Sequence, residues 1–210
     1  MLKILNILID DKFIDGLIEM FESTKGKHIH DYIIIRNKEI KKFQYITKTE
    51  YIKQVDSKEC LSFINNNGYD LVILHSLSCI PWFKINEIDK KIKILWKAWG
   101  FDLYRTPNEI QPFIKLKRFH PITQKYWRKH YRKRILTNIK IWIYDQIHRI
   151  QIKQAINRID YFSGCLPIEY LLMKRHTFFR AQYLELPYFG INSGYTKENY
   201  NIFPESCHNI

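Results

Sequence analysis

Short apolar runs that alternate with helical patterns constrain the fold of this chain more than any other feature. Residues 2–9, 29–35, 70–75 and 92–98 are almost continuously apolar, and strands that are buried on both faces read as such runs. Residues 14–21 instead place apolar side chains at i, i+3, i+4 and i+7, which predicts an amphipathic helix. This alternation predicts an α/β fold, a Rossmann-like parallel sheet with helices on both faces.

Weaker patterns complete the outline. We expect further strands at residues 43–46, 158–163 and 182–186, and helices at 57–66, 122–157 and 168–174. The 210 residues then form one Rossmann-like domain at 1–190, which includes a basic helical segment at 115–158, followed by an irregular tail at 191–210.

Several classes of site lack a supporting motif. No Gly-rich dinucleotide or P-loop pattern is present, so we expect no cofactor. The four cysteines are widely spaced, which argues against a disulfide framework or a zinc finger and favours a reducing cytoplasm. His28 and His30 share a strand face without an evident third ligand, so no metal site is expected. Neither a signal peptide nor a run of ~18 apolar residues is found.

The stretch 93–104 carries the clearest chemical signal. Its apolar strand ends in a turn that holds Gly100 and Asp102, with Trp96, Trp99 and a tyrosine close by. Ligands of α/β proteins gather at the carboxyl ends of the strands. A glycine, an acid and several aromatic residues at such an edge predict a site for a polar ligand such as a sugar.

Two residues compete for the role of general base at this edge. Asp102 would hydrogen-bond a sugar hydroxyl or deprotonate it, and His75, at the end of the run 70–75, has a pKa near operating pH. Each has a structural alternative: Asp102 as a cap of the next turn, and His75 as a histidine packed beneath the loop that follows it. Ser76 is a candidate hydrogen-bond donor to sugar or phosphate, although serines after strands commonly form turns.

The aromatic residues divide between the core and the site. If 96–98 is extended, Trp96 and Trp99 point to opposite faces, and we expect Trp99 to stack on a sugar while Trp96 packs in the core. Gly100 and Tyr104 complete the predicted substrate-binding set, and Arg105 is placed to meet phosphate. Core packing is the alternative for each aromatic residue.

The net charge of +13 is concentrated in the segment 115–158, where thirteen basic residues face one acid. Its densest cluster is Trp127, Arg128, Lys129, Arg132 and Lys133. Docking on an anionic membrane, with attraction for the pyrophosphate of a lipid-linked acceptor, is the favoured interpretation. Nucleic-acid binding and a solvated charged face are the alternatives.

The pattern Trp96-x-x-Trp99-Gly100-x-Asp102-Leu103-Tyr104, after a strand that ends in His75, resembles the bacterial Fuc4NAc:lipid II transferases, glycosyltransferase family 56. The resemblance covers the N-terminal half of those enzymes. It implies a GT-B glycosyltransferase, whose N-terminal domain holds the acceptor and whose C-terminal domain holds the nucleotide-sugar. We expect that second domain to be missing or truncated here, or supplied by a second polypeptide.

The resemblance implies transfer of a sugar of the Fuc4NAc or fucosyl type from a TDP-sugar to a polyprenyl-pyrophosphate-linked saccharide. This would occur on the cytoplasmic face of the plasma membrane during surface glycan synthesis. The main alternative is a non-catalytic, membrane-associated protein that binds the lipid-linked saccharide. A nucleic-acid partner is not expected, because the aromatic residues cluster partly outside the basic segment.

Overall fold

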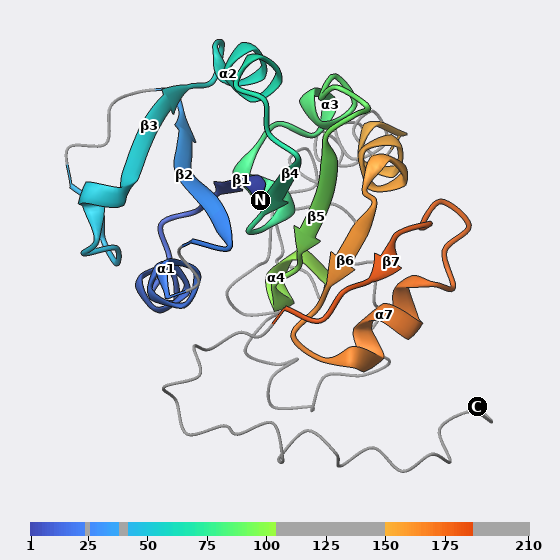
Figure 1. The fold of residues 1–210 in the computed structure, drawn as a ribbon. Helices are drawn as coiled ribbons and strands as arrows, with labels where there is room; N and C mark the ends of the chain where they lie inside the picture. The colour runs from blue at the N-terminus through green and yellow to red at the C-terminus, as the bar shows by residue number, and fades with distance from the viewer. Residues whose placement is uncertain (24–25, 38–41, 104–149, 187–210) are drawn as a thin grey trace, which may run out of the picture.

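In the computed structural model, the chain is described at residues 1–23, 26–37, 42–103 and 150–186 (Figure 1). Most of the predicted helical segment 122–157 and the predicted tail lie outside these ranges. So do seven of the predicted site residues: Tyr104, Arg105, Trp127, Arg128, Lys129, Arg132 and Lys133.

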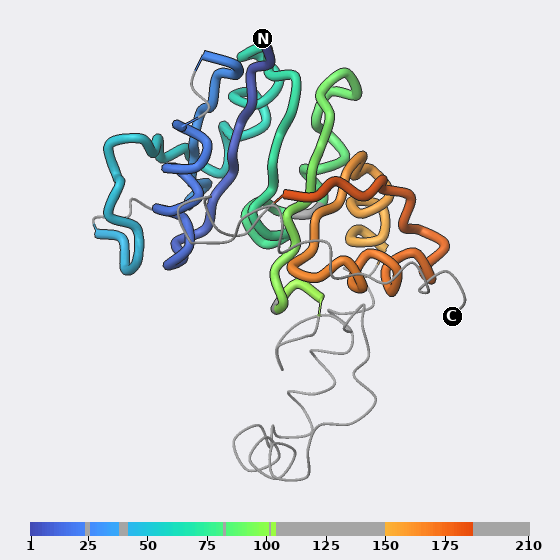
Figure 2. Tube along the Cα trace, turned by 60° about the horizontal axis from the view of Figure 1, so that its bottom comes forward, coloured from blue at the N-terminus to red at the C-terminus, as the bar shows by residue number. Residues whose placement is uncertain are grey.

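One seven-stranded parallel sheet organises the described residues, in the order β3-β2-β1-β4-β5-β6-β7. In Figure 2, β1 begins near the N-terminus and lies between β2 and β4. The predicted α/β, Rossmann-like fold class is thereby confirmed. The strands are β1 (Leu2–Ile7), β2 (His28–Arg36), β3 (Ile52–Asp56), β4 (Leu71–Leu74), β5 (Lys93–Lys97), β6 (Tyr161–Ser163) and β7 (Gln182–Tyr183).

Helices connect the strands and pack on both faces of the sheet, as expected for parallel crossovers. They are α1 (Ile14–Glu22), α2 (Cys60–Asn66), α3 (Trp82–Ile85), α4 (Gly100–Leu103), a helix at 150–158 and α7 (Pro167–Met173), with 3-10 turns at Thr49–Tyr51 and Leu77–Cys79. Within the described ranges, no helix combines the length and the apolar character that crossing a membrane requires.

Side chains alternate between two hydrophobic layers along each strand. On β1, Leu5 and Ile7 join the larger layer, which α2, α3, the helix at 150–158 and α7 cover. Ile4 and Leu8 face the smaller layer, which α1 covers. Trp96 lies fully buried in the larger layer against the edge of Phe162, so its predicted place in the core is confirmed.

The third strand was predicted in the wrong place. Residues 43–46 are not extended in the sheet, because the backbone N–H groups of residues 44–46 donate to the carboxylate of Asp10 at 2.6 to 3.2 Å. The strand is instead β3, which pairs only with β2 at the edge of the sheet. An edge strand tolerates polar residues such as Lys53 and Gln54, so β3 lacks the apolar run of an interior strand.

A buried polar chain crosses the face that α1 covers. The amide Nδ2 of Asn6 donates to the carbonyl of Asp31 at 3.3 Å and lies 3.3 Å from Nδ1 of His30. Its Oδ1 therefore accepts the Nε2–H of His75, at 3.1 Å. Asn6 and His75 are both fully buried, so His75 depends on this amide for a hydrogen bond that water does not supply.

The substitution Asn6→Leu tests this dependence. We expect the free energy of unfolding to fall by about 2 kcal/mol, because His75 and His30 would lose their buried partner. Chemical denaturation at neutral pH measures the change. Asn66→Leu, on the exposed side of α2, is the control and should cost less than about 0.5 kcal/mol. Equal effects of the two substitutions would contradict the structural role of Asn6.

Candidate functional site

The strand order places the topological switch point between β1 and β4. After β1 the chain continues to β2 and β3 on one side of the sheet, and after β4 it continues to β5, β6 and β7 on the other side. Loops that diverge in this way open the crevice where open α/β sheets bind their ligands. The loop after β4, residues 75–79, lies at this switch point, and the segment after β5 lies beside it.

The carboxylate of Asp102 ties these two segments together. Its Oδ1 accepts the hydroxyl of Ser76 at 2.7 Å and the N–H of Leu77 at 3.3 Å. Its Oδ2 accepts the backbone N–H of Trp99 at 3.0 Å and the indole N–H of Trp96 at 3.3 Å. Since the N–H of Asp102 in turn donates to the carbonyl of Trp99, Asp102 closes the first turn of α4, as in the capping alternative.

The pKa of Asp102 reflects two opposing effects. Burial raises it to about 6, while the hydrogen bonds from Trp99, Ser76, Trp96 and Leu77 favour the charged form and limit the rise. The carboxylate is mostly ionised at pH 7 and takes up a proton a little below that pH. A carboxyl group with this pKa is suited to accept a proton during a reaction near neutral pH.

Ser76 adopts a backbone conformation that normally requires glycine. Its φ of 117° and ψ of 148° make it the one non-glycine residue with positive φ in the described ranges. Such conformations cost about 1–3 kcal/mol and concentrate at functional sites. The N–H of Ser78 and the carboxylate of Asp102 hold Ser76 in place. Nothing in the local sequence signals this geometry.

The serine hydroxyls form a directed hydrogen-bond chain. The Oγ atoms of Ser76 and Ser78 are 2.7 Å apart, and Ser76 uses its single hydroxyl proton on Asp102. Ser78 must therefore donate to Ser76, which leaves the lone pairs of Ser78 Oγ available to accept a proton. Because Ser78 is exposed, the chain connects the buried Asp102 with the surface.

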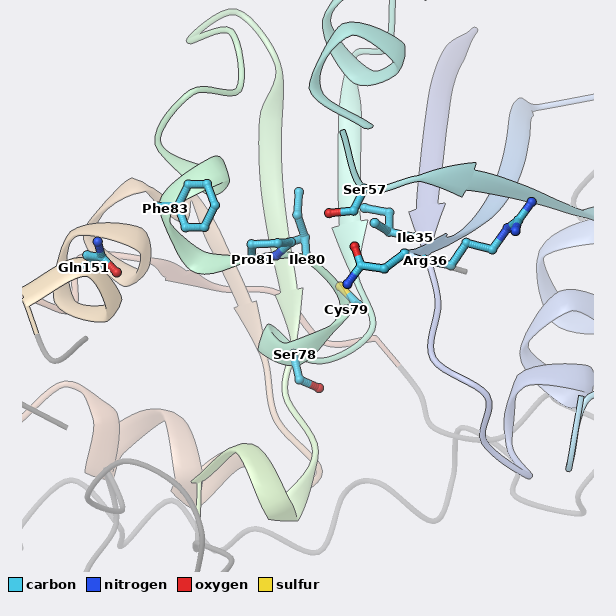
Figure 3. Close-up of a pocket in the computed structure, with 10 residues that line it drawn as sticks. Ile35, Arg36, Ser57, Ser78, Cys79, Ile80, Pro81, Phe83 and Gln151 are labelled. Carbon is cyan, nitrogen blue, oxygen red and sulfur yellow. The ribbon is translucent and has the colours of Figure 1, made fainter. Parts of the chain in front are cut away.

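A cavity of about 380 Å³ opens beside Ser78, between the carboxyl ends of β2 and β3 and the loop after β4 (Figure 3). Phe83, which is 49% exposed, faces it from α3, opposite Ser57. Arg36 contributes to the wall, but its guanidinium points away in Figure 3, as does the hydroxyl of Ser78, which lies at the rim. The lining is completed by Ile35, Asn37, Cys79, Ile80, Pro81 and Gln151.

This lining favours an uncharged polar ligand. It combines an aromatic ring with hydroxyl and amide groups, a combination that suits the apolar and hydroxylated faces of a sugar. No charged head group of the described lining residues is directed into the cavity. Sequence reasoning missed Phe83, because an isolated phenylalanine gives no signal of exposure.

His75 lies beneath the edge rather than on it. It is fully buried, and burial, with a contribution from the charge of Lys97, lowers its pKa to about 3. Its ring meets the edge of the Phe21 ring at a centroid distance of 6.4 Å. The placement matches the packing alternative, and the catalytic role of His75 stays a prediction.

The predicted sugar platform is also enclosed. Trp99 is 5% exposed, and its ring stacks on Phe13 with centroids 5.4 Å apart. The contact joins the segments that follow β5 and β1. Gly100, predicted to bind substrate, is the first residue of α4. The substrate-binding roles of Trp99 and Gly100 stay predictions.

A buried lysine completes the edge and was not anticipated from the sequence. Lys97, at the end of β5, is almost fully buried, and its ammonium donates to the hydroxyl of Ser163 at 3.2 Å and to the carbonyl of Leu186. Burial lowers its pKa to about 8, although nearby Glu169 and Glu185 oppose the shift. Lys97 thereby fastens the segment after β7 to the sheet.

A metal centre finds no support in the described part of the chain. There, no three side chains of the His, Cys, Asp or Glu type lie close enough together to hold an ion. The rings of His28 and His30 are perpendicular, with centroids 6.4 Å apart.

No family model matches the chain, and no curated protein matches it in sequence. The resemblance to a glycosyltransferase family therefore depends on the nine-residue motif and on the order of the strand that ends in His75, the motif and the basic segment. Three residues of that motif, Trp96, Trp99 and Asp102, form one hydrogen-bonded unit at the sheet edge.

The buried His75 makes stability depend on pH. The unfolded imidazole binds a proton near pH 6.5 and the folded one only near 3, so the unfolded state binds more protons between these values. Stability should fall as pH is lowered, by about 2 kcal/mol from this residue between pH 7 and pH 5. Denaturation of wild type and His75→Gln at both pH values measures this contribution. If the free energy of unfolding falls equally in wild type and in His75→Gln, His75 does not contribute to the pH dependence.

Proposed function

We propose that this chain is the acceptor-binding domain of a glycosyltransferase, with the saccharide extending from the cavity over its rim to Ser78 and Asp102 as the base that activates its hydroxyl. The observation that carries the proposal is the hydrogen-bond chain from exposed Ser78 through Ser76 to Asp102. It gives a buried carboxylate, with its pKa near 6, a route to a ligand at the cavity rim.

The chain of hydroxyls sets the direction of proton transfer. The acceptor hydroxyl gives its proton to Ser78 Oγ, the Ser78 proton moves to Ser76 Oγ, and the Ser76 proton moves to Oδ1 of Asp102. The acceptor oxygen then forms its bond to the anomeric carbon of the donor, whose nucleoside diphosphate departs with the bonding electrons. Asp102 ends protonated and returns the proton to solvent, which a pKa near 6 permits at neutral pH.

The identity of donor and acceptor comes from the motif that includes Trp96, Trp99 and Asp102. Its resemblance to family 56 supports a TDP-sugar as donor and a polyprenyl-pyrophosphate-linked saccharide as acceptor, at the cytoplasmic face of the plasma membrane. The uncharged lining of the cavity suits the saccharide part of that acceptor. The basic segment 115–158 is the proposed partner of the pyrophosphate, and a separate donor domain would hold the nucleotide.

A non-catalytic saccharide-binding protein is the second candidate. The observation that favours it is the complete set of hydrogen bonds on Asp102, because a carboxylate with four donors also serves as a purely structural link. Both candidates bind a saccharide at the cavity. The first also catalyses transfer, which Ser78→Ala should slow, whereas the second shows no transfer at all.

Substitutions at Ser78 and Phe83 separate turnover from binding. Ser78→Ala breaks the proton route and leaves the bond between Ser76 and Asp102 intact, so kcat should fall about 100-fold with little change in acceptor affinity. Phe83→Ala removes the ring that faces the cavity and should weaken acceptor binding about tenfold. The assay follows transfer from a TDP-sugar to a short-chain polyprenyl-pyrophosphate disaccharide, with this chain alone and with a donor-domain polypeptide.

Two controls and one pH profile accompany this assay. Ser62→Ala removes an exposed hydroxyl of α2 that does not line the cavity, and Tyr45→Ala removes an exposed aromatic ring elsewhere. Both should behave as wild type. The rate should rise with pH through about 6, as Asp102 ionises. Saccharide binding without turnover under every condition would favour the second candidate, and loss of both would contradict the proposal.

A further inference from the structure

The outer side of α7 presents an apolar surface to solvent. Leu166, Ile168 and Leu171 are 56%, 51% and 54% exposed. The opposite side of the helix buries Met173 and Glu169 almost completely. Exposed apolar residues that occur singly need no explanation, but three on one short helix form a patch of the kind that marks an interaction surface.

This apolar surface is held rigidly. Pro167 begins the helix with a preset backbone angle. The Glu169 carboxylate accepts the N–H of Leu166 at 3.0 Å, and the N–H of Glu169 donates to the carbonyl of Leu166 at the same distance. Met173 anchors the far end in the larger core layer. The three exposed side chains are therefore displayed by a fixed element whose inward side is already packed.

The exposed charges next to α7 in the sequence are basic. Lys174 and Arg175 follow the helix directly and Arg180 lies shortly after, and all three are exposed. Between residues 164 and 181, Glu169 is the single acid in the sequence, and it is buried. Glu185, in the segment after β7, is an exposed acid near this edge. The three exposed basic residues still give the surface a net positive charge, and apolar side chains beside such a charge are complementary to an anionic lipid surface.

The position of α7 connects this surface with the candidate site. α7 follows β6 and α4 follows β5, so both helices lie at the carboxyl edge of neighbouring strands (Figure 1). The chain of Asp102, Ser76 and Ser78 lies at that same edge. A bilayer that contacts α7 would therefore lie along the same carboxyl edge as the candidate site.

We propose that α7 docks this chain on an anionic phospholipid bilayer. Leu166, Ile168 and Leu171 enter the boundary between headgroups and acyl chains, and Lys174, Arg175 and Arg180 contact the phosphates. This surface is distinct from the basic segment 115–158, and it requires neither glycosyl transfer nor saccharide binding.

Vesicle flotation of the full chain tests the proposal. The probe is phosphatidylcholine vesicles, with or without phosphatidylglycerol. Ile168→Ser/Leu171→Ser should lower the partition coefficient on the anionic vesicles at least about tenfold, since two apolar side chains no longer enter the boundary. Lys174→Gln/Arg175→Gln should lower it about tenfold on the anionic vesicles and leave the weak binding to neutral vesicles unchanged.

A matched double variant controls for the loss of exposed apolar groups. Leu2→Ser/Ile29→Ser removes two side chains of similar exposure from the amino-terminal end of the sheet and should float as wild type. Thermal unfolding of each variant verifies that the fold is kept. The proposal is overturned if the α7 variant floats as well as the control. It is also overturned if that variant instead abolishes self-association in sedimentation equilibrium, because a second copy would then be the occupant of α7.

Flotation requires no donor and no acceptor. Failure of α7 docking and failure of glycosyl transfer are therefore separate results, and each can occur without the other.

Discussion

The carboxylate of Asp102 is the interaction on which the carboxyl edge of this sheet depends. One side chain accepts hydrogen bonds from the loop after β4 and from the beginning of α4, and thereby joins two neighbouring strand ends across the sheet. Ser76 stays in a glycine-like conformation because Asp102 and Ser78 hold its hydroxyl. Ser78 and the cavity wall beside it take their positions from Ser76, so the candidate site is built outward from a single buried acid.

The segment after β6 has an acidic residue in the same structural role as Asp102. Glu169 accepts the N–H of Leu166 after β6, as Asp102 accepts the N–H of Trp99 after β5, and each acid lies three residues beyond its donor. A Cβ at Gly164 would lie 2.5 Å from Oε2 of Glu169, so a larger residue there would force the carboxylate to move. Two acids at neighbouring sheet edges thus serve first to begin helices. Only Asp102 is joined to a chain of hydroxyls that leads to the surface.

The parts of the fold that could be predicted are those in which the residue pattern along the chain matches the burial of those residues in the folded sheet. The interior strands are apolar runs because both of their faces are covered, whereas β3 was missed because its edge position tolerates lysine, glutamine and aspartate. Asp102 was identified as a candidate from the sequence. Three of its four hydrogen-bond donors, however, are side chains or loop N–H groups that come near it only once the sheet is assembled. The stacking of Trp99 on Phe13 and the exposure of Phe83 depend in the same way on residues distant in sequence.

Burial and hydrogen bonding give Asp102 a property that a structural cap does not need. A cap at an exposed helix start keeps an ordinary carboxyl pKa, since water solvates its charge and the hydrogen bonds favour ionisation. At Asp102, desolvation outweighs four hydrogen bonds and moves the pKa to about 6. Because the unfolded carboxyl ionises near pH 3.8 and the folded one near 6, Asp102 lowers the stability of the fold as pH rises through this range. The raised pKa is compatible with the proposed proton exchange with a ligand through Ser76 and Ser78, and the proposed membrane-docking surface of α7 belongs to the same carboxyl edge of the sheet.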